Sequence, residues 1–260
     1  MIRFLSELWN FRELLVALTL REIKVRYKQT ALGVLWAILQ PASLTLIFTL
    51  VFGIFLNVQT GGIAYPVFAY SALVPWMFFS NSLSFGSLSV VNNGNLVTKV
   101  YFPREILPLS SIGAALFDFV MAFFVFAILL VIYGITPTVN FLYVIPIIVS
   151  IFLITTGISF ILCSINVLFR DIKFVIPLML QIWLFVTPVI YSINSVPEKY
   201  QAFVKLNPMV GLIENFRDAT VYGKSIDPLQ LLISTLVSFL IFIFGYWFFK
   251  SKEKVFADVM

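Results

Sequence analysis

The chain of 260 residues is 61% hydrophobic and only 11% charged, whereas a soluble domain carries about 25% charged residues. Because so few polar side chains cannot cover a soluble globule, we expect an integral membrane protein. The formal net charge of +5 does not indicate a nucleic-acid partner, since the basic residues gather at the ends of apolar runs, where the positive-inside rule expects them.

The residue types that common catalytic sites need are scarce. The chain has no His, and its one Cys, Cys163, lies inside an apolar run. Intrachain disulfides, His-dependent triads and the usual zinc sites are therefore excluded. Gly223-Lys224-Ser225 matches the end of a phosphate-binding loop, but Asp218 stands where that motif requires its first glycine. We predict no catalytic residue, no metal site and no cofactor in this chain.

Residues 1–30 place apolar side chains at helical spacing between charged ones. This pattern predicts an amphipathic helix lying on the membrane surface. Because Glu7 and Glu13 interrupt the first apolar stretch, we expect no cleavable signal peptide. A basic cluster precedes the first long apolar run, and a topogenic signal alone would explain it. The cluster consists of Arg21, Lys24, Arg26 and Lys28.

Six apolar runs reach or approach the length of about 20 helical residues that a bilayer core about 30 Å thick requires. An even number of spans puts both termini on the same side of the membrane. We therefore expect an all-α integral membrane domain over residues 31–260. The predicted spans are at about 31–56, 65–91, 106–133, 143–168, 174–192 and 229–249.

The distribution of Lys and Arg orients this topology. Of the 17 basic residues, four fall in the segment between the fifth and sixth runs and the other 13 on the opposite side. Because basic residues concentrate in the cytosol, we expect a multi-pass protein of the plasma membrane with both termini cytosolic.

The external segment between the fifth and sixth runs carries helical signals. Ser195 and Glu198 have the spacing of a capping box, and Asn207 before Pro208 is typical of a helix start. We expect two short helices within residues 196–225 that re-enter the membrane or cover the outer mouth. A hairpin on the lipid headgroups is the alternative.

Asp118 lies about twelve residues into the third run. An unpaired charge at that depth would cost at least ~2.5 kcal/mol, so this side chain must face protein or water, or be protonated. A hydrogen bond inside the bundle and a proton relay both remain open.

The stretch between the second and third runs has a more specific pattern. LVTKVYFPREILPLS, residues 96–110, resembles the cytosolic coupling-helix segment of ABC-2 export permeases. LVPWMFF at 73–79 resembles their second span, and TPVIY at 187–191 their fifth-span region. The order and spacing agree along nearly the whole chain, most closely with subunits that export O-antigen, capsular or teichoic-acid polymers.

The resemblance implies a homodimeric permease whose two copies enclose a channel across the inner membrane. Each copy would dock on a separate ABC ATPase, which would bind ATP and Mg, and the cargo would be lipid-linked polysaccharide. The implied coupling helix, 95–104, would end at Pro103. Its implied contact residues are Asn95, Thr98, Lys99, Tyr101, Phe102, Pro103 and Arg104.

The resemblance also implies two further sets of residues. Aromatic faces stack on sugar rings, although membrane-interface packing explains most aromatic residues in such a chain. The residues expected in the channel or its external gate are Trp76, Phe78, Phe79, Trp183, Phe185, Tyr191, Met209 and Phe216. The residues expected to meet the lipid diphosphate as it enters are Arg3, Arg12, Arg21 and Lys24.

Two other functions remain open at this point. An ABC-2 permease for a drug or a small lipid would share the fold and the coupling segment. A proton-coupled carrier would work through Asp118, but the sequence offers no second intramembrane acid or base and no evident inverted repeat.

Overall fold

The computed structural model describes residues 2–28 and 30–256, and side chains from residue 6 onward. These residues form helices and connecting loops, with no strand among them. The α-helices are α1 (Ile2–Asn10), α2 (Arg12–Tyr27), α3 (Trp36–Phe48), α4 (Tyr65–Asn92), α5 (Gly94–Lys99), α6 (Ile106–Ile132), α7 (Val144–Leu168), α8 (Ile172–Val186), α9 (Glu198–Lys205), α10 (Pro208–Arg217) and α11 (Pro228–Lys252). Two π-helical turns, Thr49–Phe55 and Asp218–Tyr222, extend α3 and α10.

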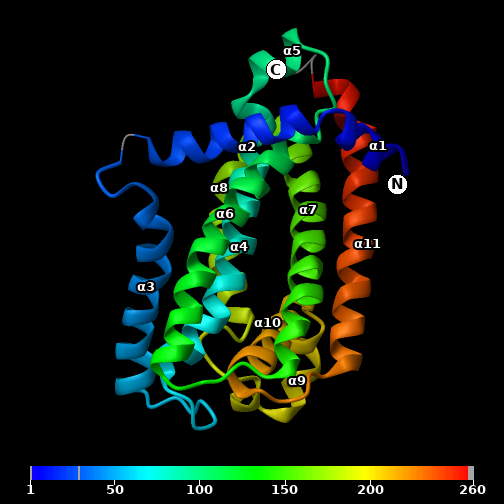
Figure 1. Ribbon diagram of the computed structural model, residues 1–260. Helices are drawn as coiled ribbons and strands as arrows, with labels where there is room; N and C mark the ends of the chain where they lie inside the picture. The colour runs from blue at the N-terminus through cyan, green and yellow to red at the C-terminus, as the bar shows by residue number, and fades with distance from the viewer. Residues whose placement is uncertain (1, 29, 257–260) are drawn as a thin grey trace.

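The long helices α3, α4, α6, α7, α8 and α11 run along a common direction (Figure 1). Helix α2 lies across one end of this bundle, beside α1, α5 and the last described residues, and we call this the α5 end. Helices α9 and α10 lie at the opposite end, which we call the α10 end. The first and last described residues therefore lie at the same end of the bundle.

Four helical segments of the described chain are long and apolar enough to cross a membrane: Gly33–Phe55, Ile106–Ile132, Val139–Leu168 and Pro228–Val255. Helix α4 is 28 residues long, but its many Ser residues make it less apolar. It packs against α3, α6, α7, α8 and α10, so protein rather than lipid surrounds most of it. Its polar side chains are therefore shielded from hydrocarbon.

The fifth predicted run is shorter as a helix than the sequence suggested. Helix α8 has 15 residues and ends at Val186, which gives a length of about 22 Å. Thr187 is already extended, with φ −94° and ψ 131°, because a residue that precedes a proline avoids the helical conformation and Pro188 follows it. The predicted end of this span at residue 192 is therefore wrong for the helix.

Helices α7 and α11 pack backbone against backbone. A Cβ added to Gly245 would lie 2.1 Å from the carbonyl oxygen of Gly157. Only glycine permits this approach, and small residues at such crossings are typical of membrane helix pairs. The crossing fixes the last helix against the centre of the bundle.

The two short helices at the α10 end differ in burial. Helix α9 has no buried residue, whereas most of α10 is buried and packs against α4, α7 and α11. A hairpin lying on the headgroups therefore does not describe α10. Asn207 caps α10 by accepting a hydrogen bond from the Met209 amide at 3.1 Å, as predicted. The predicted capping box is wrong, because no side chain caps α9, which starts at Glu198.

Candidate functional site

The segment between α4 and α6 projects from the α5 end of the bundle (Figure 1). Its helix, α5, ends at Lys99, since Val100 is extended with φ −127° and ψ 138°. Pro103 therefore does not terminate the helix, contrary to the sequence prediction. Residues 100–105 continue as an irregular linker into α6, and we call residues 94–105 the connecting segment.

The side chains of the connecting segment divide into two groups. Asn95, Thr98 and Lys99 are exposed, and the Tyr101 side chain is 97% exposed. In contrast, Phe102 is 7% exposed and packs in an apolar cluster with Val97, Phe249 and Phe256. The connecting segment thus exposes its outer surface while its inner surface is fixed to the end of α11.

An ion pair between the buried Glu105 and the partly exposed Lys250 joins the connecting segment to α11. The side chain of Glu105 has no exposed surface, and its Oε2 accepts a hydrogen bond from Lys250 Nζ at 2.9 Å. Burial raises the pKa of Glu105, and the neighbouring Lys250 opposes part of that rise. Lys250 also donates to Glu253 Oε2 at 3.0 Å. Sequence reasoning missed this site because 145 residues separate Glu105 from Lys250.

Arg104 belongs to the same network rather than to the outer surface. Its guanidinium donates to the backbone carbonyl of Glu253, and its backbone amide to Glu253 Oε1 at 3.4 Å. Glu7 of α1 lies 4.0 Å from Lys250 Nζ. These groups border a groove of about 680 Å³. Its lining comprises Glu7, Phe11, Val100, Tyr101, Phe102, Pro103, Arg104, Tyr246, Lys250, Glu253 and Lys254.

The basic residues of α1 and α2 have separate environments. Arg12 donates to the Trp9 carbonyl at 3.0 Å and lies over the Trp9 ring. Arg21 donates to Asn93, the residue just before the connecting segment, while Lys24 is exposed. The Arg3 side chain lies outside the described residues. The structure therefore brings Arg21, and not Arg12, to the connecting segment.

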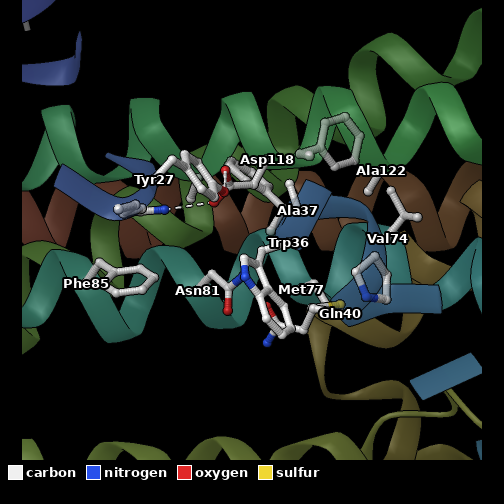
Figure 2. Close-up of a pocket in the computed structure, with 15 residues that line it drawn as sticks. Tyr27, Trp36, Ala37, Gln40, Val74, Met77, Asn81, Phe85, Asp118 and Ala122 are labelled. Atoms are coloured by element: carbon white, nitrogen blue, oxygen red, sulfur yellow. Dashed lines mark hydrogen bonds and ion pairs between the residues drawn. The ribbon is translucent and has the colours of Figure 1, made fainter. Parts of the chain in front are cut away.

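Asp118 is paired with the C-terminal turn of α2, as Figure 2 shows. Arg26 Nη1 lies 2.8 Å from Asp118 Oδ2, and the Tyr27 hydroxyl donates to Asp118 Oδ1. The Arg26 guanidinium also lies 3.9 Å from the centre of the Phe85 ring. Of the two interpretations of Asp118, the structure agrees with the hydrogen-bonded one, although both partners come from α2, which lies across the end of the bundle.

This pair borders a pocket of about 290 Å³ formed by α2, α3, α4 and α6 (Figure 2). The amides of Gln40 and Asn81 and the ring of Trp36 lie around it. The basic cluster in the sequence indicated a topogenic signal or a contact for the lipid diphosphate, and no local pattern linked Arg26 to Asp118.

Most residues predicted for the channel lie in the interior of this chain. Trp76, Phe78 and Phe79 are at most 4% exposed, and Phe79 makes an edge contact with Trp183 at 5.0 Å between ring centres. Met209 and Phe216 have no exposed surface. In this conformation these five side chains form the bundle core. Phe185, Trp183 and Tyr191 keep some surface.

Arg217 organises the α10 end. Its side chain is 1% exposed, and it pairs with Glu214 at 2.6 Å. The guanidinium also donates to the carbonyls of Pro188 and Val189 at 3.3 and 3.1 Å, and it lies over the Phe68 ring at 3.8 Å. The buried Arg217 cation thus joins α10 to the loop after α8 and to Phe68 of α4.

Known proteins resemble this chain along its length. The profile described as "ABC-2 type transporter" matches residues 13–221. The O-antigen export system permease protein RfbA of Myxococcus xanthus is 32% identical over 261 residues, covering 99% of each protein. Its namesake in Klebsiella pneumoniae is 28% identical over 249 residues, covering 95% of each. The polysialic acid transport protein KpsM of Escherichia coli is 26% identical over 245 residues, covering 92% of this chain and 93% of KpsM.

Proposed function

Because the chain belongs to the ABC-2 type transporter family, we propose that it is the membrane subunit of an ATP-driven exporter of O-antigen-type polysaccharide. The observation that carries this proposal is its similarity, over nearly the full length of both proteins, to permeases named for O-antigen export. The chain is a transport subunit, and ATP hydrolysis belongs to a separate ABC ATPase. ATP and Mg would bind to that partner.

The proposed topology has six crossings of the inner membrane with both termini in the cytosol. Helix α4, enclosed by neighbouring helices, and the short α8 would complete the six with the four apolar segments. The α5 end would face the cytosol, because it carries most of the basic residues. Helices α9 and α10 would then lie at the external mouth, where α10 would act as the gate.

The exposed part of the connecting segment would dock on the ATPase. Tyr101 is the most exposed large apolar side chain of the described chain, and an exposed aromatic side chain is a frequent anchor of protein interfaces. Asn95, Thr98 and Lys99 are also exposed on the same segment. The functional unit would contain two copies of this chain and two ATPases, with the channel between the two permeases.

The cargo would be polysaccharide on a lipid diphosphate carrier. Lys24, exposed on α2 at the α5 end, would be available to the diphosphate. The relatives named for polysaccharide transport favour this cargo over a drug or a small lipid. The ion pair of Asp118 with Arg26 argues against a proton-coupled carrier, since the carboxylate has a fixed partner.

The test is to purify the chain together with the ABC ATPase encoded beside it and to reconstitute both in inverted vesicles. We expect a complex of two permeases and two ATPases that moves lipid-linked polysaccharide into the vesicles only with ATP. A chain that binds no ATPase, or that transports polysaccharide equally well without ATP, would refute the proposal. Transport of a small lipid but not of polysaccharide would correct the cargo alone.

A further inference from the structure

The connecting segment has no rigid helical link to the bundle on its C-terminal side. Helix α5 has six residues and is followed by the linker 100–105. A force applied to Tyr101 would therefore be absorbed by this linker unless tertiary contacts hold it. The contacts that do so come from the C-terminal end of α11.

The cation of Lys250 stands at the centre of these contacts. Its Nζ reaches Glu105 at 2.9 Å, at the start of α6, and Glu253 at 3.0 Å, at the end of α11. Glu253 in turn receives the Arg104 backbone amide and, at its carbonyl, the Arg104 guanidinium. The linker is thus attached to α11 on both sides of the peptide bond between Arg104 and Glu105.

Apolar packing supports the same attachment. Phe102 of the linker lies in one buried cluster with Phe249 and Phe256 of the C-terminal region, and the rings of Phe249 and Phe256 make an edge contact at 5.4 Å. Packing alone is not directional, whereas an ion pair with buried hydrogen bonds fixes a single geometry. The ionic contacts therefore decide how the linker is held against α11.

Helix α11 can transmit a displacement over the length of the bundle. It crosses α7 with direct backbone contact at Gly157 and Gly245, and it packs against α10 at the other end. The path from Tyr101 to α10 thus consists of a tethered linker, one continuous helix of 25 residues and a packed contact. The alternative path through α6 starts at the same tether, because Glu105 immediately precedes that helix.

We propose that Lys250 is a positioning residue that makes the connecting segment and the last helix move as one body, so that ATPase motion reaches the α10 end. This inference rests on the proposed exporter function and adds a residue outside the coupling segment. Without the cation, Glu105 and Glu253 would repel each other, and the linker would yield when the ATPase moves.

The experiment uses the reconstituted complex of permease and ATPase and measures two rates, ATP hydrolysis and polysaccharide transport. Lys250→Met keeps the apolar part of the side chain and removes its charge. We expect polysaccharide moved per ATP hydrolysed to fall about tenfold, the size of effect found along coupling networks. Lys250→Arg, which keeps the cation, should restore most of this ratio. Lys252→Met is the matched control on the same helix and should retain the wild-type ratio.

A second variant separates positioning from folding. Lys250→Met combined with Glu105→Gln removes the buried carboxylate together with its partner, so that Glu105 is not left as a buried charge without its cation. This double variant should unfold at the temperature of the wild type and still show the lower ratio of transport to hydrolysis. A wild-type ratio in the double variant, or in Lys250→Met, would overturn the inference while leaving the exporter function intact. A wild-type chain that binds no ATPase would overturn both.

Discussion

The guanidinium of Arg26, in the last turn of α2, lies 2.8 Å from the carboxylate of Asp118, in the middle of α6. Only 12% and 15% of the two side chains are exposed. The pair therefore attaches α2 to the bundle at an acidic residue in the middle of a long apolar helix. The Arg26 cation also neutralises the Asp118 carboxylate, whose charge would be costly if it were unpaired at that depth.

Breaking this pair should destabilise the protein. Asp118→Asn leaves the Arg26 cation with a weaker partner, and the loss of one member of a buried pair costs about 3 kcal/mol. Thermal unfolding of the detergent-solubilised protein measures the change, and Asp171→Asn, at an exposed position between α7 and α8, is the control. Adding Arg26→Met should recover part of the loss. Additive effects of the two substitutions would mean that the residues do not interact.

Tyr101→Ala should weaken ATPase binding without altering the fold, because the side chain contacts solvent over nearly its whole surface. Truncating an anchor residue costs about 2 kcal/mol, or roughly a thirtyfold rise in Kd. Titration of the solubilised permease with ATPase measures the Kd. The control is Tyr200→Ala, half-exposed on α9 at the α10 end. Equal affinities for wild type and Tyr101→Ala would place the docking surface elsewhere.

Arg217→Met should release the loop after α8. The substitution removes the donors to the Pro188 and Val189 carbonyls and leaves Glu214 without its cation, a loss of about 3 kcal/mol. Hydrogen exchange should become faster in residues 187–192 and in α10. Lys199→Met on the exposed helix α9 should leave exchange there unchanged. Unaltered protection in Arg217→Met would show that the apolar contacts of α10 suffice.

The ionisation of Glu105 should make stability depend on pH. Burial raises its folded-state pKa above the ordinary value of 4.5, so the folded protein binds this proton more tightly than the unfolded chain does. The stabilisation is fully present below about pH 4.5 and is lost as the pH rises through the folded-state pKa. Relative to wild type, Glu105→Gln should therefore gain in Tm between pH 4.5 and pH 7.

The matched control for this pH series is Glu198→Gln, at the exposed start of α9. Its difference in Tm from wild type should stay constant over the same range. If the difference in Tm between Glu105→Gln and wild type does not change with pH, Lys250 fully offsets the effect of burial on the pKa of the Glu105 carboxyl.

The sequence by itself determined the positions of the helices and the class of the protein. Apolar runs placed the segment Gly33–Phe55 and helices α4, α6, α7 and α11 close to their observed bounds, because helix formation and hydrophobicity are properties of neighbouring residues. The resemblance of residues 96–110 to a coupling segment likewise rests on consecutive residues. The coupling role itself stays a prediction. Pro188 also carried a local signal for the end of α8, since the residue before a proline avoids helical geometry.

Only the tertiary structure decided which side chains meet. Glu105 pairs with Lys250 at a sequence separation of 145 residues, and Asp118 with Arg26 at a separation of 92. No periodicity in the chain encodes contacts between residues so far apart in sequence. The same limit explains why Phe79 and Phe216 were expected in a channel although both are buried in the core. An apolar residue contributes to the same sequence pattern whether its side chain faces lipid, a cavity or another helix. Only the packing of the folded chain distinguishes these environments.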